Sequence, residues 1–262
     1  MISTRDVVAL LQQRYPESTA AEWDFVGQQV QAPTRECSRI LFVIDVTKET
    51  VAQAMDFGAD LVVSHHPLFF GDESKIDLAD ALLAGGCSLY VAHTNADVAA
   101  PGVNDALARS LGLSDLVPLV EGHGRIGTLA SPIHLEDFAK HVLAALPATH
   151  HGVRIGGKPD SLVHRVAVAG GSGSDFMPAA LNAQVDVFVT ADCKHHVAQD
   201  FLAAGSVALV DVSHWASEWP WLQQAADLLI CDLGPGTSVE VLVSTTPTDP
   251  WSGHLSGGLS WR

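Results

Sequence analysis

The chain is poor in charged residues, and above all in basic ones. Asp, Glu, Lys and Arg make up 17% of its 262 residues, yet 30 acidic residues against 14 basic ones leave a formal net charge of -16. This balance argues against nucleic acid as a partner, because nucleic-acid binding needs clustered Lys and Arg. It argues equally against an anionic membrane surface. A phosphorylated substrate would need a local positive centre, which a bound metal ion could supply.

Paired cysteines and long apolar runs are also missing. The four cysteines form no C-x-x-C pair, which argues against a thiolate zinc ribbon. Scattered cysteines in a chain of this size fit a reducing cytosol. No run approaches the roughly 20 apolar residues of a membrane helix. The first residues lack the apolar core of a signal peptide. We therefore expect a cytoplasmic protein with no membrane partner.

Short apolar runs alternate with helical patterns, and this alternation predicts α/β architecture. In the first part of the chain we expect strands over 40–46, 61–64 and 88–92, with helices over 48–57, 76–84 and 103–111. In the second part we expect strands over 165–169, 185–190, 207–212 and 239–244. Helices are expected there from about 192 and over 221–229.

The two parts resemble each other. GADLVVSHHP and VDVFVTADCKHH are apolar runs that end shortly before a His-His pair, and SLYVAHTNAD and VALVDVSHWASE both place a carboxylate four residues after a histidine. We interpret this as two related three-layer α/β halves whose strand carboxyl ends face a shared metal-binding cleft. Chance similarity between α/β units is the rival explanation. The expected boundaries are 1–117, a bridging segment over 118–160, a second half over 161–249 and a loose tail over 250–262.

Two adjacent imidazoles, His65 and His66, follow the apolar run at 61–64. Ligands of open α/β sheets bind at the carboxyl ends of strands. Two neighbours that point in different directions could each bind a different metal ion. The alternative is that they are ordinary loop or core histidines.

A second set of polar residues follows the expected strand over 88–92. Asp97 could bridge two metal ions with its two oxygens, and His93, Thr94 and Asn95 could be the outer donors that hold it. The alternative is that Asp97 or Asn95 caps a turn.

His214 and Glu218 form a third candidate pair. On one continuous helix their i,i+4 spacing would put both on one face, where they could hold a metal ion. Pro220 favours a helix start close by, so Ser217 is the better N-cap, with His214 in the preceding loop. Both arrangements allow the two side chains to converge on a metal. The alternative for Glu218 is a helix-start charge favoured by the helix dipole.

The segment Asp192-Cys193-Lys194-His195-His196 lies where a helix should start. Asp192 is expected as its N-cap, and the two histidines suit proton transfer or phosphate contact. Cys193 resembles a nucleophile, but a cysteine inside a helix is more often buried and inert. The glycine-rich run over 170–174 could cradle an anion with its amides or form a tight turn.

Three imidazoles and two carboxylates form the predicted ligand set for a pair of divalent ions, Zn, Mn, Fe or Co. Two such ions lower the pKa of a bridging water and clamp a phosphate or carbonyl. We therefore predict a dinuclear metal-dependent hydrolase that acts on a nucleotide or small phosphorylated substrate through a metal-bridging hydroxide. His195, His196 or His93 would be its acid–base group. The alternative is a non-catalytic metal-binding regulatory or scaffold protein. The five ligands are His65, His66, Asp97, His214 and Glu218.

The chain resembles the GTP cyclohydrolase I type 2 homologues, also called Nif-three-like proteins. The resemblance implies two α/β halves around a dinuclear metal site and the ligand role for the same five residues. It also implies a ring-shaped homohexamer and, at this length, no inserted middle domain. Phe25 stands where the family usually has Asn. The matching blocks are W-D-x-V-G at 23–27, GADLVVSHHPLFF, YVAHTNADVAAPGVND, G-x-G-R-x-G at 122–127, VAVAGGSGSDF, TADCKHH and SHWASE.

Overall fold

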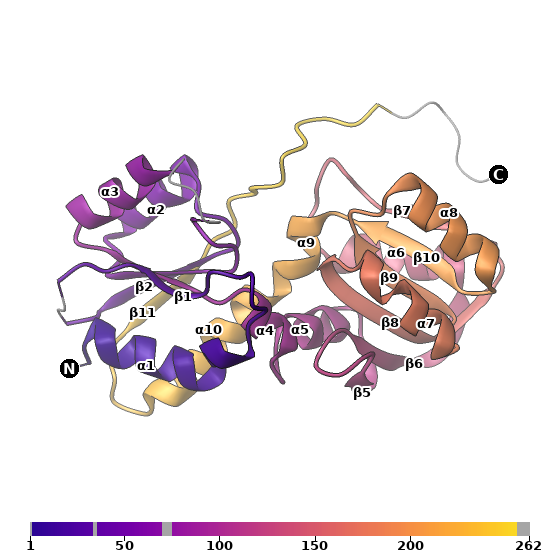
Figure 1. Ribbon diagram of the computed structural model, residues 1–262, viewed down its shortest axis with the longest axis horizontal. Coiled ribbons are helices and arrows are strands. Elements are labelled where there is room, and N and C mark those ends of the chain that lie inside the picture. Colours follow the sequence, from indigo (N-terminus) through magenta and orange to yellow (C-terminus); the bar gives the residue numbers. More distant parts are fainter. Residues whose placement is uncertain (1, 34–35, 70–74, 256–262) are drawn as a thin grey trace. The chain divides into compact units, whose positions relative to one another are not determined.

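The computed structural model describes residues 2–33, 36–69 and 75–255, which fall into two compact units (Figure 1). Unit 1 contains the chain through Ala99 and returns for Leu222–Thr248. Unit 2 contains Ala100–Trp221 and the residues from Asp249 onward. Each unit has a mixed sheet with helices, so the predicted α/β class with two halves is confirmed.

Unit 1 is built on a five-stranded sheet with the strand order β1-β4-β3-β2-β11. Its centre is three successive parallel strands, β2 (Arg39–Val43), β3 (Leu61–Ser64) and β4 (Ser88–Val91). β11 (Glu240–Val243) pairs in parallel with β2, and β1 (Gly27–Val30) pairs antiparallel with β4. Every residue of β3 and β4 is buried. Strands covered on both faces need such continuous apolar runs.

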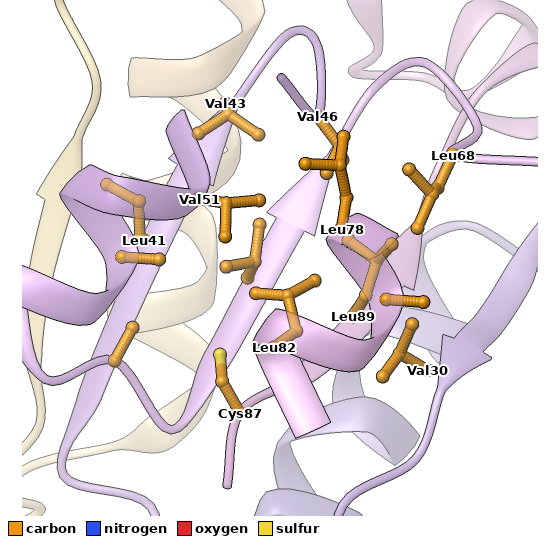
Figure 2. Close-up of a cluster of buried hydrophobic side chains, with 14 of the residues drawn as sticks. Val30, Leu41, Val43, Val46, Val51, Leu68, Leu78, Leu82, Cys87 and Leu89 are labelled. Carbon is orange, nitrogen blue, oxygen red and sulfur yellow. The ribbon is translucent and has the colours of Figure 1, made fainter. Parts of the chain in front are cut away.

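Helices cover both faces of this sheet (Figure 1). α2 (Lys48–Phe57) and α3 (Ile76–Ala84) lie on one face, while α1 (Thr4–Arg14) and α10 (Pro220–Leu233) lie on the other. Figure 2 shows the core beneath α2 and α3, where Val51 and Leu82 pack with Leu41 and Leu89 of the sheet. Leu82 is fully buried, so truncation to Ala would cost about 2–5 kcal/mol. The short elements η1 (Glu17–Thr19) and α4 (Thr94–Val98) complete the unit.

The predicted bounds of α2 are confirmed, and local chemistry explains them. The Thr47 side chain accepts from the Thr50 amide at the N-terminus of the helix. Gly58 ends the helix with φ 69, a left-handed conformation that only glycine adopts without strain. Because both signals lie within a few residues of the helix, the sequence alone reveals them.

Unit 2 has a six-stranded sheet with the order β5-β6-β8-β9-β10-β7. β8 (Leu162–Ser172), β9 (Val187–Ala191) and β10 (Ala208–Val212) are parallel. β5 (Ser114–Pro118) and β6 (Arg125–His134) extend one edge in antiparallel pairing, and β7 (Arg154–Gly156) pairs antiparallel with β10.

Helices also cover both faces of the second sheet. α7 (Met177–Asn182) and α8 (His195–Ala204) enclose a core in which Met177 and Phe201 pack against Phe188 and Leu209. α5 (Val103–Ser110), α6 (Leu135–Ala145) and α9 (His214–Glu218) contact β8. η2 (Ser174–Phe176) links β8 to α7.

The two units repeat one arrangement. Each has three successive parallel strands with an antiparallel strand beside the third. In each, a five-residue helix, α4 or α9, follows the third strand. The predicted internal likeness is therefore present in the strand order as well as in the sequence pattern.

The unit boundaries differ from those predicted. The segment over 118–160 is not a bridge, because β6 and β7 complete the sheet of unit 2. α5 also belongs to unit 2, and β11 returns to unit 1 to pair with β2. These assignments depend on partners far away in the sequence. Of the predicted tail, 250–255 is described and has no helix or strand, whereas 256–262 lies outside the described residues.

Within the described part of the chain, the helices are all too short or too polar to cross a lipid bilayer.

Candidate metal centre

His65 and His66 lie directly beyond the carboxyl end of β3. The hydrogen bonding of the strand continues through them, since their amides donate to the carbonyls of Val43 and Ile44. His65 is buried, and its Nδ1 lies 2.9 Å from the Ala92 carbonyl oxygen. That oxygen accepts hydrogen bonds, so Nδ1 carries the proton and Nε2 presents the ring's lone pair.

His66 has the same arrangement with a carboxylate in place of the carbonyl. Its Nδ1 donates to Oδ1 of Asp45 over 2.7 Å. The other Asp45 oxygen accepts from the Thr248 hydroxyl, which holds the carboxylate in place. A histidine held in this way keeps one tautomer and one ring orientation, as metal-binding histidines do.

His93 follows β4 and is held by a second carboxylate. Its Nδ1 donates to Oδ1 of Asp24 over 2.9 Å, and the Thr94 amide and hydroxyl donate to Oδ2. Burial by itself would raise the pKa of Asp24, but the hydrogen bonds from His93 and Thr94 outweigh it and hold that pKa below its usual range. Asp24 is therefore an ionised acceptor at neutral pH.

His65, His66 and His93 together form what we call the histidine cluster. One ring nitrogen of each lies within 4.8 Å of the other two. The His65 ring centroid is 5.0 Å from that of His66 and 5.1 Å from that of His93. Asp97, on α4, adds a carboxylate whose Oδ1 lies 3.8 Å from His65 Nε2. The structure thus brings together three of the predicted ligands and one predicted acid–base residue.

Two of the residues that precede Asp97, predicted as donors that hold its carboxylate, bond to another carboxylate. His93 and Thr94 bind the buried Asp24 carboxylate. Asn95 donates from Nδ2 to the Tyr15 carbonyl over 2.7 Å.

In unit 2, His214 and Glu218 share one face of α9. His214 Nε2 lies 3.0 Å from Glu218 Oε1. Ser213 is the N-cap, and its side chain accepts from a first-turn amide. The prediction that Ser217 caps a helix and leaves His214 in the loop is therefore wrong. Pro220 begins a separate helix, α10, in whose first turn its missing N–H costs nothing.

Asp192 holds the other ring nitrogen of His214, with 2.6 Å between Nδ1 and Oδ2. The negative charge of Glu218 raises the pKa of His214 to about 11, in spite of burial, and the hydrogen bonds to Asp192 and Glu218 add to the rise. The hydrogen bond from His214 in turn holds the pKa of Asp192 below its usual range. The metal-free imidazole is a cation between two carboxylates, and binding a metal through it requires loss of a proton.

In the glycine-rich run over 170–174, three of the amides that could cradle an anion are already bonded to side chains. Strand β8 extends into the run as far as Ser172. Gly171 has φ 64, and a Cβ there would collide with Glu218 Oε1, so glycine allows this backbone to approach the carboxylate. The amides of Gly170, Gly171 and Gly173 donate to the side chains of Asn104, Ser217 and Thr190.

His195 and His196 begin α8 and are both exposed, with ring centroids 5.0 Å apart. Asp192 is not the cap of this helix, because Lys194 occupies the N-cap position. Cys193 precedes the helix, and burial is the main reason that its thiol pKa rises to about 12. A thiolate is the nucleophilic form of cysteine, so this thiol is a poor nucleophile at neutral pH.

The sequence does not identify the carboxylates that hold the histidines. Asp24 lies in the W-D-x-V-G block, and Asp45 lies within the apolar run over 40–46. For Asp192 the sequence indicates only a helix cap. Their acidic character and positions were visible, but each pairing joins residues that are about 20 to 70 positions apart. Such pairings depend on the sheet order.

The donor set fits divalent metal ions. Four histidines are each held through Nδ1 by a carbonyl or carboxylate oxygen. Metal-binding imidazoles are commonly oriented by a hydrogen bond of this kind at the nitrogen that does not bind the metal. Imidazole and carboxylate donors without thiolates suit Zn, Mn, Fe or Co. Both clusters follow parallel strands at their carboxyl ends, where α/β proteins bind ligands.

These features define a two-unit α/β protein with histidine and carboxylate clusters at its strand ends. Comparison with known proteins gives the family. The chain belongs to the Duf34/NIF3 (NGG1p interacting factor 3) family, whose model matches residues 2–250. The predicted resemblance is therefore confirmed.

Two curated relatives carry the name "GTP cyclohydrolase 1 type 2 homolog". The Streptomyces coelicolor protein is 40% identical over an alignment that covers 96% of this chain and 94% of the relative. The Mycobacterium leprae protein is 31% identical, with 94% of each chain covered. The latter alignment runs over 367 positions, more than the 262 residues of this chain, so that relative contains additional residues that this chain lacks.

Solved structures give the same fold. A Bacillus cereus protein related to NIF3 superposes with a TM-score of 0.88 at 23% identity, covering 95% of this chain and 98% of its own. A Staphylococcus aureus hypothetical protein superposes with a TM-score of 0.86 at 28% identity, covering 94% of this chain and 97% of its own.

Proposed function

We propose that this protein is a metal-dependent hydrolase that acts on a nucleotide or another small phosphorylated substrate. The observation that carries the proposal is the histidine cluster, in which three imidazoles held through Nδ1 lie within 4.8 Å of one another. The name that the curated relatives carry, which refers to a cyclohydrolase acting on GTP, agrees with a nucleotide as the substrate class.

Two divalent ions per chain are part of the proposal, with the five ligands expected from the sequence. Ions bound there would supply Lewis acidity, which polarises a phosphoryl or carbonyl oxygen and activates water. They would also provide the positive charge that a chain of net charge -16 lacks for an anionic substrate. The ligands are His65, His66, Asp97, His214 and Glu218.

His93 is the acid–base residue that the geometry favours among the three predicted. Asp24 accepts the Nδ1 proton of His93, so Nε2 is the atom that would take a proton from substrate or water. The buried carboxylate also stabilises the imidazolium that forms. His195 and His196 are exposed, and within the described part of the chain no carboxylate orients either ring.

The first test is the metal content per chain, measured by mass spectrometry on protein purified without chelator or affinity metal. We expect close to two equivalents. His65→Ala and His214→Ala should lower the content more than His195→Ala, which serves as the matched control. Equal losses in all three variants would contradict the ligand assignment.

The second test is turnover of a panel of nucleotides and phosphoesters by the metal-loaded protein. We expect hydrolysis of at least one member, and its loss in His93→Asn with the metal content retained. Loss of metal in His93→Asn would instead make His93 a ligand. Full metal loading without turnover, beside an active control enzyme, would favour the non-catalytic metal-binding or scaffold protein.

The oligomeric state is also a proposal. We propose a homohexamer, as the family resemblance implies, and sedimentation of the full chain measures it. A monomer or dimer at micromolar concentration would refute this part without affecting the metal assignment.

A further inference from the structure

An open cavity in unit 1 includes, among its lining residues, the carboxylate that holds His93 of the histidine cluster. Its volume is about 560 Å³, which is within the range of roughly 300–1,000 Å³ typical of small-molecule pockets. Asp24, whose carboxylate holds His93, is one of its lining residues. Phe25 and Phe69 supply aromatic surface to its wall. We call this cavity the acidic pocket.

The charge of the acidic pocket is of one sign. Glu17, Glu22 and Asp24 line it, and its described lining includes no Lys, Arg or His. The Asp24 carboxylate is fully buried and occupied by hydrogen bonds, whereas Glu17 and Glu22 are exposed. A phosphate would be repelled here, while a group with N–H donors or positive charge would be attracted.

Glu17 is held in position before any ligand arrives. Gln12 Nε2 donates to Glu17 Oε1 over 2.9 Å. The carboxylate lies against Gly27, where a Cβ would come within 2.5 Å of Oε1. Gly27 has φ 90, a region that residues with a side chain rarely adopt. This close approach of backbone to carboxylate gives Gly27 a role within the W-D-x-V-G block.

Two aromatic side chains of the same loop are unusually accessible. Phe25 is 48% exposed and Trp23 is 61% exposed. The Trp23 ring meets His93 edge to face, with centroids 6.1 Å apart. Exposed aromatic surface beside carboxylates favours planar cations and donor-rich rings, which stack on the ring face and present N–H groups at their edge.

We propose that the acidic pocket binds a planar group with adjacent N–H donors, such as an amidine, a guanidine or an aminopyrimidine edge. Its flat face would pack on Phe25 and its donors would bind Glu17. The inference deepens the proposed function and rests on it in one respect, that this group is the part of the substrate that does not react at the metals. The binding itself requires neither metal nor turnover.

A matched series of probes tests this chemistry on the full-length, metal-free protein. Benzamidine, benzamide and benzoate share one ring and differ in the charge and donors of its substituent. We expect benzamidine to bind with a Kd of about 1 mM, a usual strength for so small a ligand. Benzamide should bind about tenfold more weakly. Benzoate should not bind measurably.

The location of binding needs its own control, because a chain of net charge -16 attracts cations everywhere. Amide chemical shifts on benzamidine titration should change over 17–27 and little elsewhere. Glu17→Gln should weaken benzamidine about tenfold, to the level of benzamide. Glu49→Gln, which removes an exposed carboxylate of α2, should leave the affinity unchanged.

Phe25→Ala is the second variant, and it should weaken benzamidine and benzamide by a similar factor, because it removes the stacking surface. Equal affinities for benzamidine and benzamide would overturn the inference, as would shift changes spread over the whole surface or an unaltered affinity in Glu17→Gln. Turnover and metal binding in the same preparation report on the proposed function separately. If the protein hydrolyses a substrate but binds benzamidine no more tightly than benzamide, the proposed pocket is refuted and the proposed function is not.

Discussion

A buried ion pair in unit 2 explains two of the family blocks and makes a sharp stability prediction. Asp105 ends the block that begins at Tyr90, and Arg125 lies in the G-x-G-R-x-G block. Their side chains are 9% and 4% exposed, with 2.6 Å between Arg125 Nη2 and Asp105 Oδ2. The same Oδ2 accepts from the Gly102 amide at the start of α5, and Arg125 Nη1 donates to the Gly124 carbonyl over 2.7 Å. Each block therefore contributes one member of a buried ion pair.

Removing one member of this ion pair should lower the unfolding free energy of unit 2 by far more than the intact pair contributes to it. Asp105→Ala leaves a guanidinium buried without its carboxylate, so we expect unit 2 to lose about 3–5 kcal/mol of unfolding free energy. Asp105→Asn retains an oxygen for the Gly102 amide but loses the charge. Its loss of unfolding free energy should be slightly smaller than that of Asp105→Ala. Replacing both members, as in Asp105→Leu with Arg125→Met, should recover most of the loss because no unpaired charge remains.

The measurement should report on unit 2 alone. The urea dependence of hydrogen exchange in peptides that cover β6 and β8 gives the free energy of opening of that sheet. The control is Glu136→Ala, which breaks the exposed pair between Glu136 and Lys140, with side chains 45% and 64% exposed. We expect at most about 1 kcal/mol there. A loss in Asp105→Ala no larger than in Glu136→Ala would refute the reasoning.

Three further predictions follow from the described contacts. Asp192→Ala should weaken metal binding by about 10- to 100-fold, because it frees the ring of His214, and calorimetry with the preferred ion measures it. Asp24→Asn should destabilise unit 1 by about 1–3 kcal/mol at pH 7. Since the folded pKa of Asp24 lies below its unfolded value, this penalty is fully present above the ordinary pKa of Asp and should shrink as the pH falls from there toward the folded pKa, so urea unfolding should show a smaller penalty at pH 3 than at pH 7. Cys231 is exposed, whereas the Cys193 thiol has a pKa of about 12, so a disulfide reagent at pH 8 should react fast with one thiol per chain. Cys231→Ser should abolish the fast phase, and a fast phase that persists would contradict the assignment.

Much of the fold could be predicted because its signals are local. The bounds of α2, α3 and β3 agree with the prediction, since each has a compact apolar pattern with a cap or turn beside it. The unit boundaries could not be predicted in this way. β11 pairs with β2 although about 200 residues separate them, and no local pattern records that choice.

The helix at His214 shows how a local signal can mislead. Pro220 correctly indicated a helix start, and α10 does begin there. A second, five-residue helix ends just before it, however, capped by Ser213. The sequence contains the Ser213 cap as well, but no local signal separates a five-residue helix from the longer helix that follows it.

The residues that have the chemistry of a metal site can be identified from the sequence alone. Imidazoles and carboxylates follow apolar runs at 61–64, 88–92 and 207–212, and residue type together with strand position is a local property. The tertiary structure decided their partners. Asp24, Asp45 and Asp192 each orient a histidine that is distant in the sequence, and a sheet order that places β2, β3 and β4 side by side is what brings His65, His66 and His93 within reach of one another. Hydrogen bonds act over about 3 Å, so only the folded chain can select which acid meets which imidazole.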